Sequence, residues 1–579
     1  MKKILIPFAA ASIGVAAYLY QQHEKAYDVL DFVPADTVLF AGALEPKPIK
    51  DYLAIAANYS TAEDIQQIEN LYDLSEDSSP AKQFFFSLLT EYQALISDPE
   101  QMIKTFGLGS TVRSYGYTLG LLPVVKIEIA NPQAIWDLLD KHELETGFLH
   151  EEGTLKDITY RSYRVTSPED ETQLDIIIAQ KDGFLTITIN TELLNSNELL
   201  AMALGLEKPA VSLTDSGTIS DIAKKHNFSQ QGIGFLNHVA IIEGLTGAKD
   251  SLLAEQLATL SEQNNNESFT ALHSQVCQEE YATIAEHWPR TAFGYTQMDV
   301  TPEEVTIGLS YVIESKNQVI LSALQSLRGF IPSYTQDFDN NIASASLGLN
   351  INELSGSLTT IWNDLQTPTY QCQPLATMQA QISQAGQSIG MLGMATNMAA
   401  GVKGISAALF DYEVSEDLNG KPLLASLDAL ISLHADNPET IFNSVKMFSP
   451  DLQQVQLTTD GNTIPLNEIV PIDPALNINP QIAIKGNHIV IYNGERGKQT
   501  AEKLGKEKLS TNGLYQTSFD IVRIFTPIIE VMAASGEEVQ EELMMILNYD
   551  MNMNMNLDIN DQGIRFDTTI KTESAEDIK

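Results

Sequence analysis

Short stretches of alternating apolar and polar residues recur along the chain and are separated by helical stretches. Residues 125–129 and 430–433 show the alternation that is typical of half-buried strands. Each is followed by an Asn-Pro pair, at 131–132 and at 437–438. Asn caps a helix, and Pro fits the first helical position, where no N–H is needed. The pattern therefore predicts that strand, cap and helix recur as a unit in the two halves of the chain.

Three further blocks of sequence recur in the same order, so the whole series has four members. They pair an entry segment and first strand, a hairpin, and a second hairpin in each half. In chain order they are residues 32–42 with 330–348, 178–187 with 482–491, and 299–307 with 558–566. A single matching block could arise by chance, but four matching blocks in the same order along the chain indicate an internal duplication.

The duplication predicts an α+β fold of two tandem homologous units, each an antiparallel sheet backed by helices. We place the units at residues 30–320 and 325–579. The third and fourth blocks are farther apart in the first half than in the second. This difference predicts a helical insertion at about residues 245–290 of the first unit.

Residues 1–26 have the layout of an export signal. Lys2 and Lys3 precede an uncharged apolar run at 4–20. A run of this length lies at the lower limit of about 17 to 25 residues for a membrane-spanning helix. It exceeds the roughly 7 to 15 residues of a cleaved signal core. We expect an uncleaved, single-pass anchor in the inner membrane, with residues after about 25 in the periplasm. The alternative is a soluble periplasmic protein after signal cleavage.

The chain is strongly acidic. Its 579 residues contain 76 Asp and Glu against 34 Lys and Arg, which gives a formal net charge of −42. Nucleic acids are bound by clustered Lys and Arg, so this charge argues against a nucleic acid partner.

The segment 32–37 follows the anchor and a short spacer and reads Phe-Val-Pro-Ala-Asp-Thr. In this arrangement the chain resembles a family of uncharacterised bacterial envelope proteins, a domain of unknown function whose exported region opens with a Pro-Ala-Asp-Thr-like phrase. The resemblance covers only this segment and the general layout. It implies an anchored extracytoplasmic protein and supplies no catalytic residue. The second unit has Pro-Ser-Tyr-Thr at 332–335, so we interpret the phrase as a strand entry.

Recognisable motifs for catalysis, cofactors or metals are missing from the sequence. It contains no Gly-x-Ser-x-Gly elbow and no phosphate-binding loop. Its histidines lack the spacing of a zinc site, and we expect His142 and His150 at the surface. His273 and Cys277 are four residues apart, but the neighbouring Glu279 and Glu280 disfavour a thiolate. We therefore predict no cofactor and no metal, and the motifs favour a protein that is not an enzyme.

Cys277 and Cys372 are the only cysteines. An even count in an exported protein indicates pairing, because thiols are oxidised in that compartment. Both lie in stretches without a counterpart in the other repeat, which is easier to explain if they meet. We predict a disulfide between them. The alternative is two unpaired buried thiols.

The segment 385–410 interleaves small and soft apolar residues. The positions of interest are Gly386, Gly390, Met391, Met394 and Met398. Glycine inside a helix costs up to about 1 kcal/mol relative to alanine, so close packing must compensate. The pattern allows a tightly packed core helix, or an apolar surface that receives a lipid, a peptide or a partner helix.

Three functional hypotheses follow from these patterns. The first is a non-enzymatic periplasmic binding or scaffold protein, anchored in the inner membrane, with an unknown envelope protein as its partner. The second is a carrier or chaperone for an apolar ligand, either a lipid or a peptide. The third is an uncharacterised hydrolase that joins Ser or Asp residues from both units in a cleft.

Overall fold

The computed structural model confirms the α+β class, with antiparallel strands and helices throughout. It describes residues 28–50, 52–53, 79–96, 98–166, 173–191, 197–248, 251–263, 270–301, 304–337, 339–384, 386–416, 422–473, 476–535 and 551–573. The predicted signal anchor at 1–26 lies outside these residues. Within the described ranges, no helix is long and apolar enough to cross a membrane. The chain divides into two compact units, Met1–Thr296 and Gln297–Lys579.

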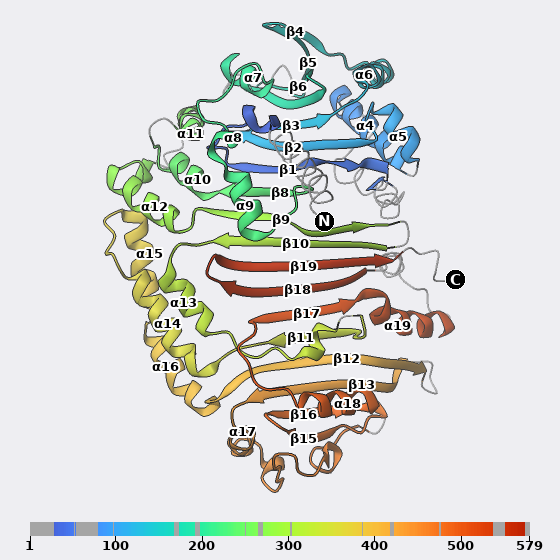
Figure 1. The fold of residues 1–579 in the computed structure, drawn as a ribbon, viewed down its shortest axis with the longest axis vertical. Helices are drawn as coiled ribbons and strands as arrows, with labels where there is room; N and C mark the ends of the chain where they lie inside the picture. Colours follow the sequence, from blue (N-terminus) through green and yellow to red (C-terminus); the bar gives the residue numbers. More distant parts are fainter. Residues whose placement is uncertain are drawn as a thin grey trace, which may run out of the picture. The chain divides into compact units, whose positions relative to one another are not determined.

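The first unit contains an antiparallel sheet (Figure 1). Its strands are β1 (Leu39–Pro48), β2 (Thr111–Leu119), β3 (Leu122–Glu128), β4 (Glu151–Leu155), β5 (Ile158–Arg164), β6 (Leu174–Lys181), β7 (Phe184–Thr191), β8 (Ile233–Asn237) and β9 (Arg290–Val300). They lie in the order β4–β5–β6–β7–β3–β2–β1–β8–β9.

Helices and short 3₁₀ turns connect these strands. They are η1 (Asp28–Phe32), α4 (Pro80–Ile96), α5 (Pro99–Thr105), α6 (Pro132–Thr146), α7 (Asn197–Ala203), α8 (Leu213–Ser216), α9 (Thr218–His226), α10 (His238–Leu245), α11 (Leu252–Gln263), η2 (Thr270–Leu272) and α12 (Gln275–His287). Helices α4 and α6 cover one face of the sheet, where Phe84 and Leu139 pack against Ile178 and Leu185.

The second unit also consists of paired antiparallel strands with helices. The strands are β10 (Glu304–Glu314), β11 (Ala343–Leu347), β12 (Val402–Glu416), β13 (Pro422–Ala435), β14 (Ile464–Pro465), β15 (Gln481–Lys485), β16 (His488–Asn493), β17 (Tyr515–Asp520), β18 (Met551–Asn560) and β19 (Gly563–Glu573). Their order is β14–β15–β16–β13–β12–β11–β17–β18–β19–β10.

The helical elements of the second unit lie along the strand ends and over one face of the sheet (Figure 1). They are α13 (Gln318–Ser326), η3 (Ser333–Gln336), α14 (Ile351–Leu365), α15 (Gln373–Ser383), α16 (Gly386–Thr396), η4 (Asn397–Ala399), α17 (Pro438–Lys446), η5 (Pro450–Leu452), η6 (Leu466–Glu468), α18 (Gly494–Leu504) and α19 (Ile521–Ser535). Ala501 and Leu504 of α18 pack on Leu430 and Val490, which closes the core on that face.

The two units share one order of strand pairing. The series β6–β7–β3–β2–β1–β8 of the first unit corresponds to β15–β16–β13–β12–β11–β17 of the second. Helices α6 and α17 follow β3 and β13, and both begin with an Asn N-cap and Pro in the first turn, as predicted. Three of the four recurring blocks of sequence therefore fall at corresponding places in the two units, whereas the block at 299–307 extends into β10 of the second unit.

The additional length of the first unit is divided between two connections. Residues 192–232 join β7 to β8, whereas 494–514 join the corresponding β16 and β17. Residues 238–289 join β8 to β9, whereas 521–550 join β17 to β18. The second of these connections contains the helical segment expected at about 245–290.

Candidate functional site

Strand alternation in the second unit buries serines beside the apolar core on one face and leaves apolar side chains exposed on the other. In β12, Ser406 is buried, whereas the adjacent Ile405 is 49% exposed. In β13, Ser432 is buried, whereas Ile431 is 50% exposed. Strands β11 and β17 alternate in the same sense. An antiparallel sheet with one solvated face normally turns polar side chains outward, so the exposed isoleucines depart from the usual pattern.

The pairing register aligns exposed apolar side chains in one row, because directly opposed residues on neighbouring strands project from the same face. We call this set the apolar row. From one end to the other it contains Ile405, Leu347, Tyr515, Leu557, Phe566 and Tyr311. The row crosses six strands, which at about 4.8 Å per step is a span of about 24 Å.

All members of the apolar row except the half-buried Leu557 are exposed. Leu347, Tyr515, Phe566 and Tyr311 are between 37% and 45% exposed. Alternation along β18 places Met555 and Met553 on the same face as Leu557. A contiguous exposed apolar surface marks a site for an apolar ligand or partner, and thioether side chains adapt to irregular shapes.

On the opposite, buried face of this sheet, polar side chains bond one another. Tyr334 Oη lies 2.8 Å from Ser406 Oγ and 3.0 Å from Ser432 Oγ. Ser406 Oγ lies 2.7 Å from His434 Nε2, and His434 Nδ1 lies 2.8 Å from His488 Nδ1. Both histidines are completely buried.

The buried network superficially has the residue types of a serine nucleophile and its base. Burial, together with the neighbouring His488, lowers the pKa of His434 to about 3. Burial also lowers the pKa of His488. Both imidazoles are therefore neutral at pH 7, and neither ring has a surface that a substrate can reach. The network holds the polar face together as part of the core.

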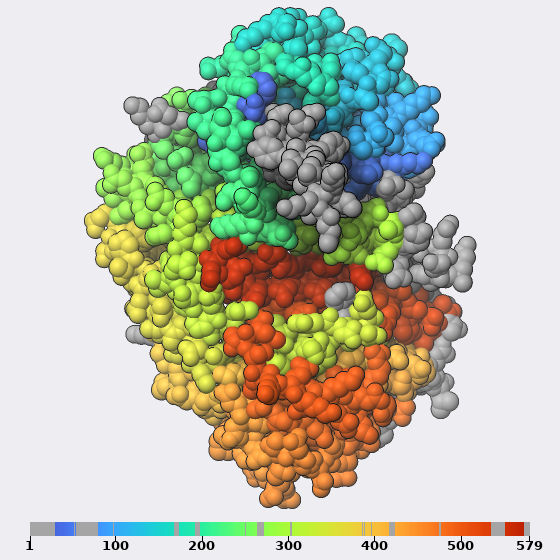
Figure 2. All heavy atoms as spheres, viewed as in Figure 1, coloured from blue at the N-terminus to red at the C-terminus, as the bar shows by residue number. Residues whose placement is uncertain are grey.

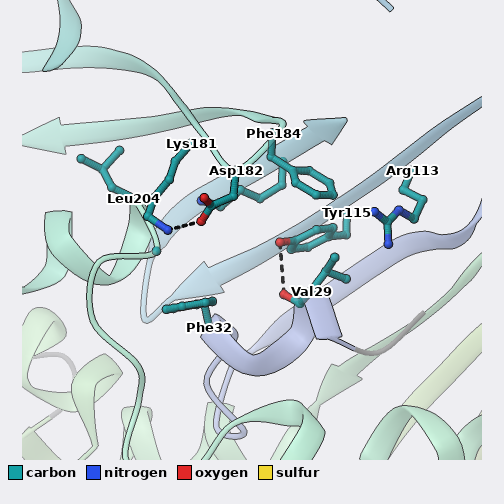
Figure 3. A pocket seen from close by; sticks show the side chains of 10 residues that line it. Val29, Phe32, Arg113, Tyr115, Lys181, Asp182, Phe184 and Leu204 are labelled. Carbon is teal, nitrogen blue, oxygen red and sulfur yellow. Dashed lines mark hydrogen bonds and ion pairs between the residues drawn. The ribbon is translucent and has the colours of Figure 1, made fainter. Parts of the chain in front are cut away.

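The first unit contains a pocket of about 380 Å³ (Figure 3). This volume lies within the usual range of about 300 to 1,000 Å³ for small-molecule sites. Strands β2 and β3, the β6–β7 turn, η1 and the segment after α7 supply its walls. It is lined by Val29, Phe32, Arg113, Tyr115, Lys126, Lys181, Asp182, Phe184, Leu204 and Gly205.

Lys126 forms the buried floor of the pocket. Its position in β3 is opposite Tyr115 of β2 and Thr186 of β7. The Nζ donates a hydrogen bond of 2.7 Å to the Thr186 hydroxyl, and the residue is only 6% exposed. Burial, together with the charge of Lys181, lowers the pKa of Lys126 to about 7, and Asp182 opposes the shift. A substantial fraction of Lys126 is therefore a neutral amine at neutral pH.

Two aromatic rings and an arginine that is ion-paired to a glutamate form one side of the pocket. Figure 3 shows Tyr115 and Phe184 next to each other, with ring centroids 5.9 Å apart. Arg113 lies 5.4 Å from the Phe184 ring and pairs with Glu128 at 2.9 Å. Burial would raise the pKa of Glu128, but the hydrogen bonds and charge of Arg113 outweigh burial and lower it. The Tyr115 hydroxyl donates to the Val29 carbonyl at 3.2 Å.

Two lysines approach the ring of Phe32 at the other side of the pocket. Lys181 lies 5.7 Å and Lys208 lies 5.4 Å from its centroid. Lys208 pairs with Asp31 at 2.6 Å, and Lys181 pairs with the adjacent Asp182. The lining therefore contains three basic side chains and one carboxylate, in a chain whose net charge is −42.

The second unit has no lysine at the position that corresponds to Lys126. Ser432 of β13 lies opposite Ser406 and Val490, as Lys126 lies opposite Tyr115 and Thr186 in the first unit. The corresponding place therefore carries a hydroxyl of the buried network instead of an amine that lines a pocket.

The predicted methionine surface is exposed. Met391 and Met394 of α16 are 60% and 69% exposed, and Met398 of η4 is 49% exposed. A Cβ on Gly386 would lie 3.0 Å from the Trp362 ring of α14, whereas a Cβ on Gly390 would meet nothing within 4 Å. Close packing thus involves Gly386 but not Gly390, and the three methionines are not core residues. The yellow segment that contains α14 and α16 lies at the molecular surface in Figure 2.

The predicted disulfide is present. Neither cysteine is a free thiol, and Cys277 and Cys372 are both disulfide-bonded and buried. They are the only two cysteines of the chain, so they pair with each other.

One expectation about the histidines was wrong. His142 is 2% exposed, because α6 turns it toward the core, and burial lowers its pKa. In the part of the chain that the structure describes, no group of three or more His, Cys, Asp or Glu side chains has the arrangement of a metal site.

No protein-family model, no curated protein and no solved structure matches this chain. The sequence reasoning missed both the apolar row and the pocket around Lys126. Strand alternation was a signal for each, but alternation alone does not tell which face the helices cover.

Proposed function

We propose that this protein is a periplasmic carrier for a ligand with a long apolar chain, anchored in the inner membrane through residues 4–20. The apolar row is the observation that carries the proposal. Exposure of apolar surface to water costs about 25 cal/mol per Å², and a ligand that covers the apolar row would remove this cost. We further propose that the two units are homologous copies, which the recurring sequence blocks and the common strand order support. Signal cleavage stays the alternative to an anchor.

Hydrocarbon is a better occupant of the apolar row than an extended peptide. The backbone groups of β12, β11, β17, β18 and β19 are paired with neighbouring strands on both sides. The face therefore offers side chains and no free backbone groups. A peptide laid across it would leave its own N–H and C=O groups unpaired, whereas an acyl chain has none to satisfy.

A direct binding test uses the full chain after removal of bound lipid. A fluorescent fatty acid serves as the probe, and Ile405→Glu and Ile431→Glu each place a charge in the proposed site. We expect each variant to weaken binding at least tenfold. Leu144→Glu is the matched control, because Leu144 is 84% exposed and belongs to the first unit, not to the sheet that carries the row. Equal affinity of wild type and both the Ile405→Glu and Ile431→Glu variants would refute the carrier.

Native mass spectrometry after gentle purification gives an independent readout. A co-purifying lipid supports the carrier, and its loss in Ile405→Glu assigns it to the apolar row. A bound peptide and no lipid would contradict the choice of hydrocarbon.

A scaffold role is the second candidate, and the methionine surface favours it. Met391, Met394 and Met398 are exposed, and α17, which packs beside η4, is followed by Met447 and Phe448 at 69% and 70% exposure. Under this hypothesis the surface binds an unknown envelope protein. Crosslinking in the native envelope tests it: one partner that is lost on Met394→Glu supports a scaffold, and an unchanged pattern argues against it.

The hydrolase hypothesis stays a prediction with weaker support. The Ser406–His434 pair is buried, so a substrate would have to open the core to reach it. A hydrolase panel in which Ser406→Ala abolishes an activity of the wild type would establish it, and no activity in the panel would argue against it.

A further inference from the structure

We infer that the pocket of the first unit binds a small carbonyl compound that carries a carboxylate, and that Lys126 holds this compound as an imine. The inference is independent of the apolar row and of the carrier proposal. It depends on three features of the pocket: the position of the amine, the basic lining and the aromatic walls.

The position of Lys126 suits a nucleophile. Its Nζ is at the floor of the pocket and has a hydrogen bond to Thr186 at 2.7 Å. A Cβ placed on Gly205 would lie 3.9 Å from this Nζ, so the absence of a side chain at Gly205 keeps space open beside the amine. Burial among Tyr115, Phe32 and Leu204 disfavours the ammonium form, and only the neutral amine attacks a carbonyl.

The basic lining supplies the partner for a carboxylate. Lys181 points into the pocket from the β6–β7 turn, and its present partner Asp182 is 78% exposed at the side chain. An exposed ion pair contributes only about 0 to 1 kcal/mol, so a ligand carboxylate displaces Asp182 at little cost. Arg113 adds positive charge but stays bound to Glu128 through hydrogen bonds of 2.9 and 3.1 Å.

The aromatic walls favour a planar or apolar body between the two polar ends. Phe32 lies on one side, and Tyr115 and Phe184 lie on the other (Figure 3). The Tyr115 hydroxyl already donates to Val29, and burial raises the pKa of Tyr115, so this ring stays neutral.

The chemistry needs no further reactant. The lone pair of the neutral Nζ forms a bond to the carbonyl carbon, and a proton moves from nitrogen to oxygen to give a carbinolamine. Loss of one water then gives the imine. The reaction is reversible and involves no oxidation, so the site captures its ligand without consuming it.

Reductive trapping tests the inference. The full chain is incubated with 4-carboxybenzaldehyde and cyanoborohydride, and the modified lysines are identified by peptide mass spectrometry. We expect Lys126 to be modified at least tenfold faster than exposed lysines such as Lys498, and trapping to increase as the pH rises through about 7. Modification of Lys126 at the rate of Lys498 would overturn the inference without the need for any variant.

Two variants and one further probe separate the parts of the inference. Lys126→Arg keeps a positive charge but forms no imine, so trapping at this site should disappear while the protein stays folded. Lys181→Met should slow trapping of 4-carboxybenzaldehyde about tenfold and change that of benzaldehyde little. Equal slowing of both probes, or none, would contradict the carboxylate. Fatty acid binding should be unchanged in both variants, which separates this site from the carrier.

Discussion

Lys126 of β3 and Thr186 of β7 lie opposite each other, and the Lys126 Nζ donates a hydrogen bond of 2.7 Å to the Thr186 hydroxyl in a buried position. A buried amine without a partner is unfavourable, so this contact stabilises the floor of the pocket.

Thr186→Val should lower the free energy of unfolding by about 1 to 3 kcal/mol, because it removes the acceptor of a buried donor. The control is a double-mutant cycle with Lys126→Met, measured by urea denaturation. In the Lys126→Met background the same change should be nearly neutral, since no amine is left unpaired. Additive losses in the double variant would show that the hydrogen bond does not couple the two residues.

Stability should fall as the pH is lowered from 7 to 5. Burial lowers the pKa of His434 from 6.5 to about 3 in the folded state, and it also lowers the pKa of His488. Below pH 6.5 the unfolded state therefore binds protons that the folded state does not. Each histidine contributes a slope of up to about 1.4 kcal/mol per pH unit.

Unfolding at pH 7, 6 and 5 measures this slope. His434→Asn should reduce it, whereas His287→Asn, a change at an exposed histidine, should leave it unaltered. A slope that is the same in His434→Asn and wild type would contradict the assignment.

The N-caps of α6 and α17 should contribute different amounts to the free energy of unfolding. The Asn437 side chain accepts a hydrogen bond from the Thr440 N–H at 3.0 Å, whereas Asn131 caps α6 with its backbone and makes no side-chain cap bond. Asn437→Ala should therefore cost about 1 kcal/mol, and Asn131→Ala clearly less. Chemical denaturation compares the two, and a larger loss at Asn131 would contradict the structural difference.

Reduction of the Cys277–Cys372 disulfide should lower stability substantially. In the chain-entropy model, a loop of this length corresponds to about 4 to 5 kcal/mol as an upper value. Electrophoresis with and without reductant should show different mobilities. Cys277→Ser, Cys372→Ser and the double variant should lose the same stability, because each removes the same bond. Equal mobility of the oxidised and reduced chains would argue against the bond.

The proposed topology predicts the behaviour of the N-terminal segment. A reporter that is active only in the periplasm, fused after Lys579, should be active if Lys2 and Lys3 hold the N-terminus inside. Carbonate washing should leave the protein in the membrane pellet if residues 4–20 anchor it. Release to the supernatant would show cleavage, and an inactive reporter would contradict the periplasmic location.

The sequence by itself determined the local elements and their repetition. Asn-Pro pairs identified the starts of α6 and α17, because capping and proline geometry act within one helical turn. The turn at 182–183 identified the β6–β7 hairpin, because both residues adopt positive φ there. Two cysteines in a chain that the N-terminal pattern predicts to be exported were enough to predict their pairing.

Only the tertiary structure decided which side of each strand is buried. Alternation alone assigns Lys126 to a solvated face and Val125 to the core, yet Lys126 is 6% and Val125 39% exposed. The same reversal occurs at Ser432 and Ile431 of the second unit. Alternation of period two separates the two faces of a strand, but it does not predict which face distant segments cover. Here η1 packs on the face that carries Lys126, and α18 packs on the face that carries Ser432. The pocket and the apolar row both result from this reversal, since each joins residues that only strand pairing brings together.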